Sequence, residues 1–276
     1  MRKSYLTPLL ALAVALSLPM QAQAHRAWVV PSATVLSGDD PWVTFDAAVS
    51  NTLFHADHAA MRLQGLQATG PDGKAVEISN SSTGKYRSTF DLQLTQQGTY
   101  KVAFTSGGLN ARWQDKEGKR HMWPERGKTA TDADFATAVP KDAKDLQVSR
   151  SYRSIETYVT RGEPSTQALA ASGKGFELVP VTHPNDLVAG ESARFTLLID
   201  GQPAVGAKVT VIAGAMRYRD GQQEINVTSD DKGQINITWP HAGMFWLSAN
   251  YSDDKAAAPA TKRTGSLSVT LEVLPE

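Results

Sequence analysis

The residues of this sequence best suited to bind a metal ion are histidines near its amino-terminal end. The first of the six histidines, His25, stands in the segment AQAHRAWVVPS directly after Ala24. If the chain is cut after Ala24, His25 carries a free α-amine, and that amine and the imidazole Nδ1 can chelate a metal together. A second imidazole would complete a three-nitrogen site of the histidine-brace type, which favours Cu(II) and then Ni(II).

The segment SNTLFHADHAAM supplies the best partners for His25. It holds His55, Asp57 and His58 within four residues, followed by Met61. Imidazole and carboxylate ligands suit first-row metals, and the Met61 thioether would favour Cu(I). Asp57 would act either as a ligand or as a second-layer group that orients one. The segment follows an expected strand, so it lies in a loop, and the site forms only if His25 starts at the same end of the sheet.

The other three histidines are weaker candidates for metal ligands. His121, in KRHMWPE, could cap a site from above, although a surface loop is its simpler interpretation. His183 precedes a proline, which holds it extended and favours a structural turn. His241, in TWPHAG, falls in a turn between two expected strands. No catalytic residues are expected, because the chain contains no G-x-S-x-G elbow, phosphate-binding glycine loop or H-E-x-x-H motif.

Residues 1–24 have the composition of a cleaved signal peptide. MRK is a positive n-region, LLALAVALSLPM an apolar run and Ala22-Gln23-Ala24 a signal-peptidase pattern. The apolar run is about 12 residues, whereas a membrane-spanning helix needs about 20. We therefore expect an exported protein that does not span the membrane after processing, in the periplasm or secreted, with the periplasm favoured.

Composition excludes several kinds of function. The chain has no cysteine, which rules out thiolate catalysis, iron–sulfur clusters and cysteine zinc sites. Without Arg2 and Lys3 there remain 26 basic against 28 acidic side chains. This near-neutral balance, without basic runs, predicts no binding of nucleic acid.

The elements that must position these histidines are β-strands. Short β-rich stretches such as PWVTFDAAVS, YRSTFDLQL and TYKVAFTS are separated by turn signals such as SGDD and GPDG. They predict an amino-terminal β-sandwich over residues 25–160, with an irregular insertion at 107–149 that includes Trp113, Trp123 and a short helix at 132–138. Residues 161–175 read as a linker.

Seven further stretches, among them ARFTLLID, AKVTVIAG and SLSVTLEVL, predict a second sandwich over residues 176–276. The expected fold class is therefore all-β, with two immunoglobulin-like or transthyretin-like β-sandwich domains after a cleaved signal peptide.

Several of these segments resemble domain-of-unknown-function family 4198. They are the opening HRAWVVPS, the stretches GTYKVAFTS and IETYVTRGEPS, and the run from FELVPVTHPNDLVAGE to TSDDKGQINITWPHAGMFWLSA. Members of that family are loosely labelled periplasmic components of nickel or cobalt uptake, often alongside outer-membrane receptors. The resemblance implies an exported two-sandwich protein that handles Ni, Co or Cu.

We therefore expect a non-enzymatic, transition-metal-binding accessory protein, with His25, His55, His58 and Asp57 as the site and Met61 and His121 as lesser candidates. An outer-membrane receptor or another uptake component would be the partner. One alternative is an adhesion or scaffold module that binds a receptor or carbohydrate and is indifferent to its amino terminus. The other is a copper-dependent oxidative enzyme that uses the same three nitrogens.

Overall fold

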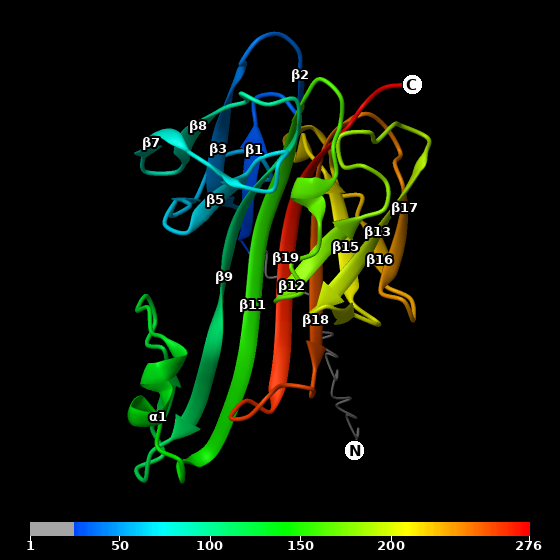
Figure 1. Ribbon diagram of the computed structural model, residues 1–276. Helices are drawn as coiled ribbons and strands as arrows, with labels where there is room; N and C mark the ends of the chain where they lie inside the picture. The colour runs from blue at the N-terminus through cyan, green and yellow to red at the C-terminus, as the bar shows by residue number, and fades with distance from the viewer. Residues whose placement is uncertain (1–24) are drawn as a thin grey trace, which may run out of the picture.

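The computed structural model describes residues 25–276 and is almost entirely β (Figure 1). A five-stranded sheet has the order β1-β3-β8-β7 with β4 beside β3, and its members are β1 (Arg26–Pro31), β3 (Trp42–Ser50), β4 (Ala59–Ala60), β7 (Ser79–Thr83) and β8 (Ser88–Gln93). A four-stranded sheet pairs β13 with three neighbours, and its members are β12 (Phe176–Pro180), β13 (Ser192–Ile199), β14 (Gln202–Pro203) and β17 (Gln234–Thr238).

A ten-stranded sheet lies between these two. Its order is β16-β15-β18-β19-β11-β9-β5-β6, with β10 beside β9 and β2 beside β11. The strands are β2 (Val35–Leu36), β5 (Leu66–Thr69), β6 (Ala75–Val76), β9 (Gly98–Gln114), β10 (Arg120–Trp123), β11 (Lys144–Arg161), β15 (Lys208–Ala213), β16 (Ile225–Thr228), β18 (Gly243–Asp253) and β19 (Lys262–Val273). The helical elements are short: α1 (Phe135–Ala138) and the 3-10 turns η1 (Asp132–Asp134), η2 (Gln167–Leu169) and η3 (Met216–Tyr218).

The central sheet carries a hydrophobic core on each face, because side chains alternate along a strand. On β11, Tyr158 belongs to the core against the four-stranded sheet, whereas its neighbour Val159 belongs to the core against the five-stranded sheet. A third cluster joins Trp28 of β1 to Ile212 and Trp246 of the central sheet. The expected all-β class with packed sheets is confirmed, and both sandwiches use the same central sheet.

This shared sheet changes the expected division of the chain. β11 runs from residue 144 to 161 and pairs in parallel with β19, from the very end of the sequence. The two expected units therefore interlock through neighbouring strands, and the 161–175 segment connects two layers packed on one sheet. Sequence patterns missed this because strand pairing across such a distance leaves no local signal.

The expected irregular insertion at 107–149 is regular in part. β9 continues to Gln114, β10 pairs with it, and β11 has already begun at Lys144. The twisted ends of β9 and β11 extend beyond the sandwich, with α1 beside them (Figure 1). A small core closes this extension, made of Leu109, Ala111, Val139, Val148 and Ala260, with Trp113 and Trp123 packed against it. Both tryptophans of the insertion are thus packed, and the expected short helix is present.

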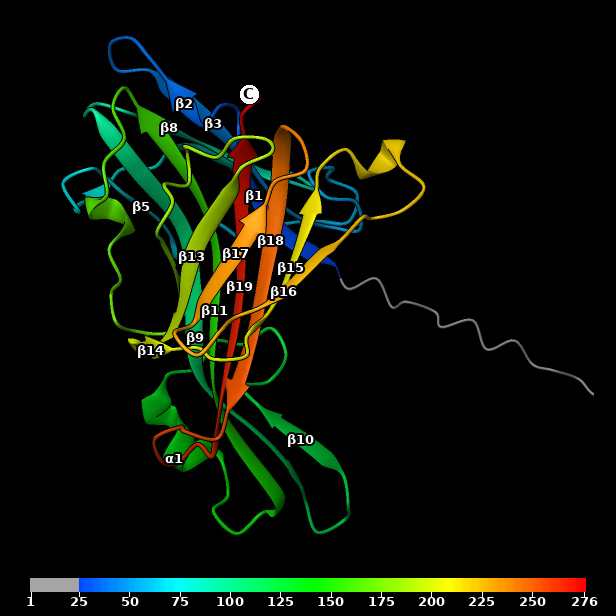
Figure 2. The same ribbon diagram turned by 90° about the vertical axis from the view of Figure 1, so that its right-hand side faces the viewer.

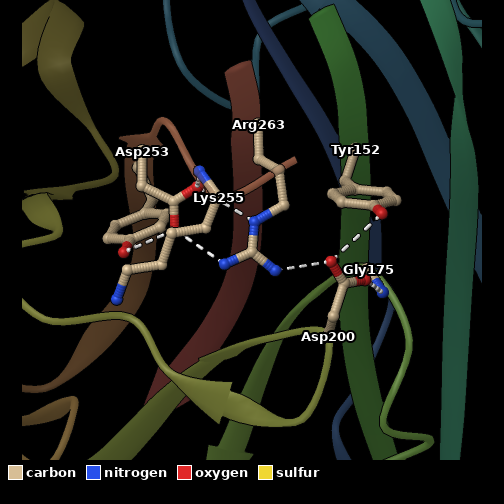
Figure 3. Close-up of polar contacts among 7 residues, drawn as sticks. Tyr152, Gly175, Asp200, Asp253, Lys255 and Arg263 are labelled. Atoms are coloured by element: carbon tan, nitrogen blue, oxygen red, sulfur yellow. Dashed lines mark hydrogen bonds and ion pairs between the residues drawn. The ribbon is translucent and has the colours of Figure 1, made fainter. Parts of the chain in front are cut away.

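A buried arginine joins the central sheet to the four-stranded layer (Figure 3). Arg263 of β19 donates to both carboxylate oxygens of Asp253, at 2.9 and 2.7 Å, and to Asp200 at 2.7 Å. Tyr152 of β11 donates its hydroxyl to Asp200 at 3.2 Å. Only 10% of the Arg263 side chain is exposed, so solvent screens its positive charge poorly and the two carboxylates neutralise it.

Candidate functional site

The antiparallel pairing of β1 with β3 brings His25 to the histidine-rich loop. Arg26, the first residue of β1, lies opposite Ser50, the last residue of β3. Residues 51–58 continue directly from that end of β3, so His25 and the loop share one end of the five-stranded sheet. The geometric condition that the sequence left open is therefore met.

The imidazole rings of His25 and His58 lie against each other. Their centroids are 3.7 Å apart and their planes differ by 12°, and both residues are exposed. His25 also lines a groove of about 540 Å³ over the central sheet, together with Thr210 and Ser248. Two imidazoles from distant parts of the sequence thus meet at a solvent-accessible edge.

Asp57 shapes the loop that carries His58. Its Oδ1 accepts the backbone N–H of Asn51 at 2.8 Å, and its Oδ2 accepts that of Thr52 at 3.1 Å. Partial burial works to raise the pKa of Asp57, but these two N–H groups outweigh it, and the net pKa lies below the ordinary value. Of the two roles expected for Asp57, this geometry fits the orienting one.

Two further contacts fix the same loop. Arg26 donates to the carbonyl of Asn51 at 3.2 Å, which ties the loop to β1 beside His25. Phe54 adopts a left-handed backbone with φ of 58°, rare for a side-chain-bearing residue. Its ring packs edge-on against buried Trp28 at a centroid distance of 5.7 Å. The loop is thus anchored by packing as well as by hydrogen bonds.

His55 lies in the same loop but lines a different hollow. It is exposed and borders a cavity of about 470 Å³ with Asp46, Phe54 and Arg87. His25 is not among the residues of that cavity, and His55 is not among those of the groove beside His25. His55 is therefore positioned near the pair without being stacked on it.

The two lesser candidates lie elsewhere. Met61 is 5% exposed, and its side chain belongs to the core under the five-stranded sheet, so its thioether does not face the loop surface. His121 lies on β10, near the far end of the long strands from β1 (Figure 2). There its Nε2 contacts Asp115 Oδ2 at 2.8 Å, and its ring stacks on Trp113 at 5.4 Å. The structure brings neither residue to His25.

His183 has the structural role expected of it. Its Nδ1 accepts the backbone N–H of Asn185 at 3.2 Å, so its Nε2 carries the proton that faces Thr99 Oγ1 at 2.9 Å. Burial lowers the pKa of His183 below 6.5. His241 is exposed in its turn and packs beside Phe245.

The part of the chain that the structure describes, residues 25–276, contains no group of three or more His, Asp or Glu side chains arranged to hold a metal ion. Within these residues the imidazoles of His25 and His58 lie in contact, with their rings stacked. Over the same residues, no helix has the length and apolarity to cross a bilayer.

Comparison with known proteins gives one family match and distant structural likenesses. The family described as "Domain of unknown function (DUF4198)" matches residues 22–253. Comparison with curated proteins finds no match. The D0-D1 domain of intimin is 11% identical, covering 89% of this chain and 97% of that one, with a TM-score of 0.23. An ICAM-5 D1-D4 ectodomain fragment is 10% identical, covering 91% of this chain and 51% of that one, with a TM-score of 0.21. The function must therefore be argued from the site itself.

Proposed function

Because the chain belongs to the DUF4198 family, for which no function is settled, we propose its function from the His25–His58 pair. The protein binds a transition-metal ion in the periplasm and serves the uptake or delivery of that ion. It is a binding protein without turnover of its own. The observation that supports this proposal is the contact of the two imidazole rings at 3.7 Å.

The ligands would be the α-amine and Nδ1 of His25 and one imidazole nitrogen of His58. Both rings are exposed, so their side chains are free to rotate from the stacked arrangement into one in which the nitrogens converge. The amine is available only after cleavage behind Ala24, where AQA provides the processing pattern. His55 would supply a further imidazole from the same loop, and Asp57 would hold the loop in place.

A donor set made of nitrogen alone favours Cu(II), with Ni(II) and Co(II) following in the usual order of affinities for divalent ions. The metal label carried by the family points to nickel and cobalt instead. The protein would pass its ion to an outer-membrane receptor or another uptake component. An edge site serves this purpose, because a partner can approach the metal from solvent.

The test begins with the exported protein. Intact mass should show His25 as the first residue, and calorimetric titration with Cu(II), Ni(II) and Co(II) should show one-to-one binding. A matched protein with one alanine before His25 should lose the binding, because the chelating amine is displaced. His58→Ala should weaken binding by at least tenfold, equivalent to about 1.4 kcal/mol.

His241→Ala is the control, since His241 is also exposed but lies in a separate turn. Undiminished binding after the alanine insertion would show that the α-amine of His25 is not a ligand. If no metal binds to the correctly processed protein, the proposed function is wrong.

A further inference from the structure

A second site candidate lies on the other face of the central sheet. There β5, β9 and β11 extend past the edge of the four-stranded layer and leave a groove of about 810 Å³. This volume is within the range of about 300–1,000 Å³ typical of pockets for small ligands. The lining includes Gln67, Thr69, Lys101, Tyr152, Glu156 and Gln167.

A buried ion pair forms the floor of this groove. Glu156 is 2% exposed, and its Oε2 lies 2.9 Å from the ammonium group of Lys101. The hydroxyl of Tyr158 donates to the same oxygen at 2.9 Å, and the hydroxyl of Ser154 donates to Oε1. Three donors therefore bind the Glu156 carboxylate. Lys101 is 21% exposed and has N–H groups left over.

The groove lining holds four basic and two acidic side chains, and two of the basic groups are paired with carboxylates. Lys101 is neutralised by Glu156, and Arg150, at one end, is paired with Asp132. Glu177 also lines the groove, and its two oxygens accept the backbone N–H groups of Ser172 and Gly173. The other two basic groups of the lining, Arg153 and Lys174, are exposed to solvent. A bound anion would lie next to Glu156, so an uncharged ligand fits better.

Tyr152 gives the same groove an aromatic surface. Its partners on the two neighbouring strands are both glycines, Gly107 on β9 and Gly265 on β19. Phe176 packs over Gly265, where an added Cβ would lie 2.4 Å from the Phe176 ring. Gly107 and Gly175 both lie close to the Tyr152 ring, where an added Cβ would be 3.2 and 3.5 Å from its Cδ1, and neither carries a side chain that would cover the ring. All three residues line the groove.

We propose that this groove binds a saccharide, with one sugar ring on Tyr152 and sugar hydroxyls hydrogen-bonded to Lys101 and the polar side chains around it. An uncharged polyhydroxyl ligand uses the amide, hydroxyl and ammonium groups of the lining without burying new charge. Its apolar C–H face packs on the aromatic ring. Tyr152 and Glu156 are four positions apart on β11, which is about 13 Å along a strand, so more than one sugar ring can be held.

The test uses an array of immobilised uncharged and acidic glycans with the full mature protein, followed by calorimetry on the best-bound free glycan. An uncharged glycan should bind saturably without added metal. Tyr152→Leu should weaken that binding at least tenfold, whereas Tyr152→Phe should keep it, because Phe retains the ring. Lys101→Met combined with Glu156→Gln should also weaken binding at least tenfold while leaving no buried unpaired charge.

Tyr218→Leu is the matched control, because Tyr218 is 85% exposed and lies outside the groove. Circular dichroism should show that every variant is folded. The saccharide site is refuted if no glycan on the array binds, if acidic glycans bind better than uncharged ones, or if Tyr152→Leu and Tyr218→Leu have equal effects. This test does not require metal to bind at His25, and its outcome does not bear on the proposed metal site.

Discussion

The indole Nε1 of Trp246 donates a hydrogen bond of 3.1 Å to the backbone carbonyl of Ala27. Trp246 lies on β18 near the end of the sequence, and Ala27 is two residues after His25. The Ser268 hydroxyl donates to the same carbonyl at 3.2 Å. The start of β1 is thus held onto the central sheet, and His25 does not extend from a frayed end.

This anchor predicts the effect of Trp246→Phe. The substitution keeps a large apolar ring but removes the donor to Ala27, so the free energy of unfolding should fall by about 1 to 2 kcal/mol. Metal affinity at His25 should fall with it. Urea unfolding and calorimetry measure the two effects. Trp42→Phe, at a site that is 50% exposed, should change neither.

Asp57→Ala tests whether metal binding depends on the conformation of the loop as well as on the ligand side chains. Two backbone N–H groups, of Asn51 and Thr52, lose their acceptor, and we expect a loss of about 1 to 3 kcal/mol in unfolding free energy. Metal affinity should fall although His25 and His58 are intact. Asp115→Ala serves as the comparison, because Asp115 contacts His121 on the distant hairpin. If Asp57→Ala leaves metal affinity unchanged, metal binding does not depend on the hydrogen bonds that this carboxylate accepts.

The Arg263 cluster predicts sensitivity to acid. Hydrogen bonds from Arg263 hold the pKa of Asp253 at about 2, below the ordinary 3.8. A depressed pKa means that this stabilisation is present above pH 3.8 and is lost as the pH falls toward 2. It amounts to about 1 to 2 kcal/mol once solvent screening is allowed for. Asp253→Asn should therefore destabilise the protein at pH 6 and have much less effect near pH 2.

Urea unfolding at the two pH values measures this difference. Asp254→Asn, at the exposed neighbour, should show no such pH-dependent penalty. An equal penalty for Asp253→Asn at both pH values would contradict the assignment.

His183 predicts a second pH effect at milder acidity. Burial lowers its pKa below 6.5, so the unfolded chain takes up a proton more readily than the folded one. Stability should therefore decline as the pH falls below about 6.5 toward the lowered folded pKa. His183→Gln keeps an N–H donor for Thr99 and cannot titrate, so it should flatten this decline. Thermal unfolding between pH 7.5 and 5 provides the measurement, with exposed His241→Gln expected to leave the slope unchanged.

The sequence by itself determined the all-β class, and it predicted the candidate metal ligands. Alternating apolar stretches and turn signals are local features, so strands such as 42–50 and 192–199 were visible in the amino-acid order. The processing pattern before His25 and the pair His55 and His58 were also local. These features predicted which groups could bind a metal, and they left open whether the groups meet.

Only the tertiary structure decided the long-range relationships. The stack of His25 on His58 depends on the register of β1 with β3. The shared central sheet depends on the parallel pairing of β11 with β19. The Lys101–Glu156 pair had no sequence signal at all. Each of these contacts joins residues distant in the sequence, and the pairing is selected by the burial of whole strand faces, a property of the assembled sheet that no local stretch contains.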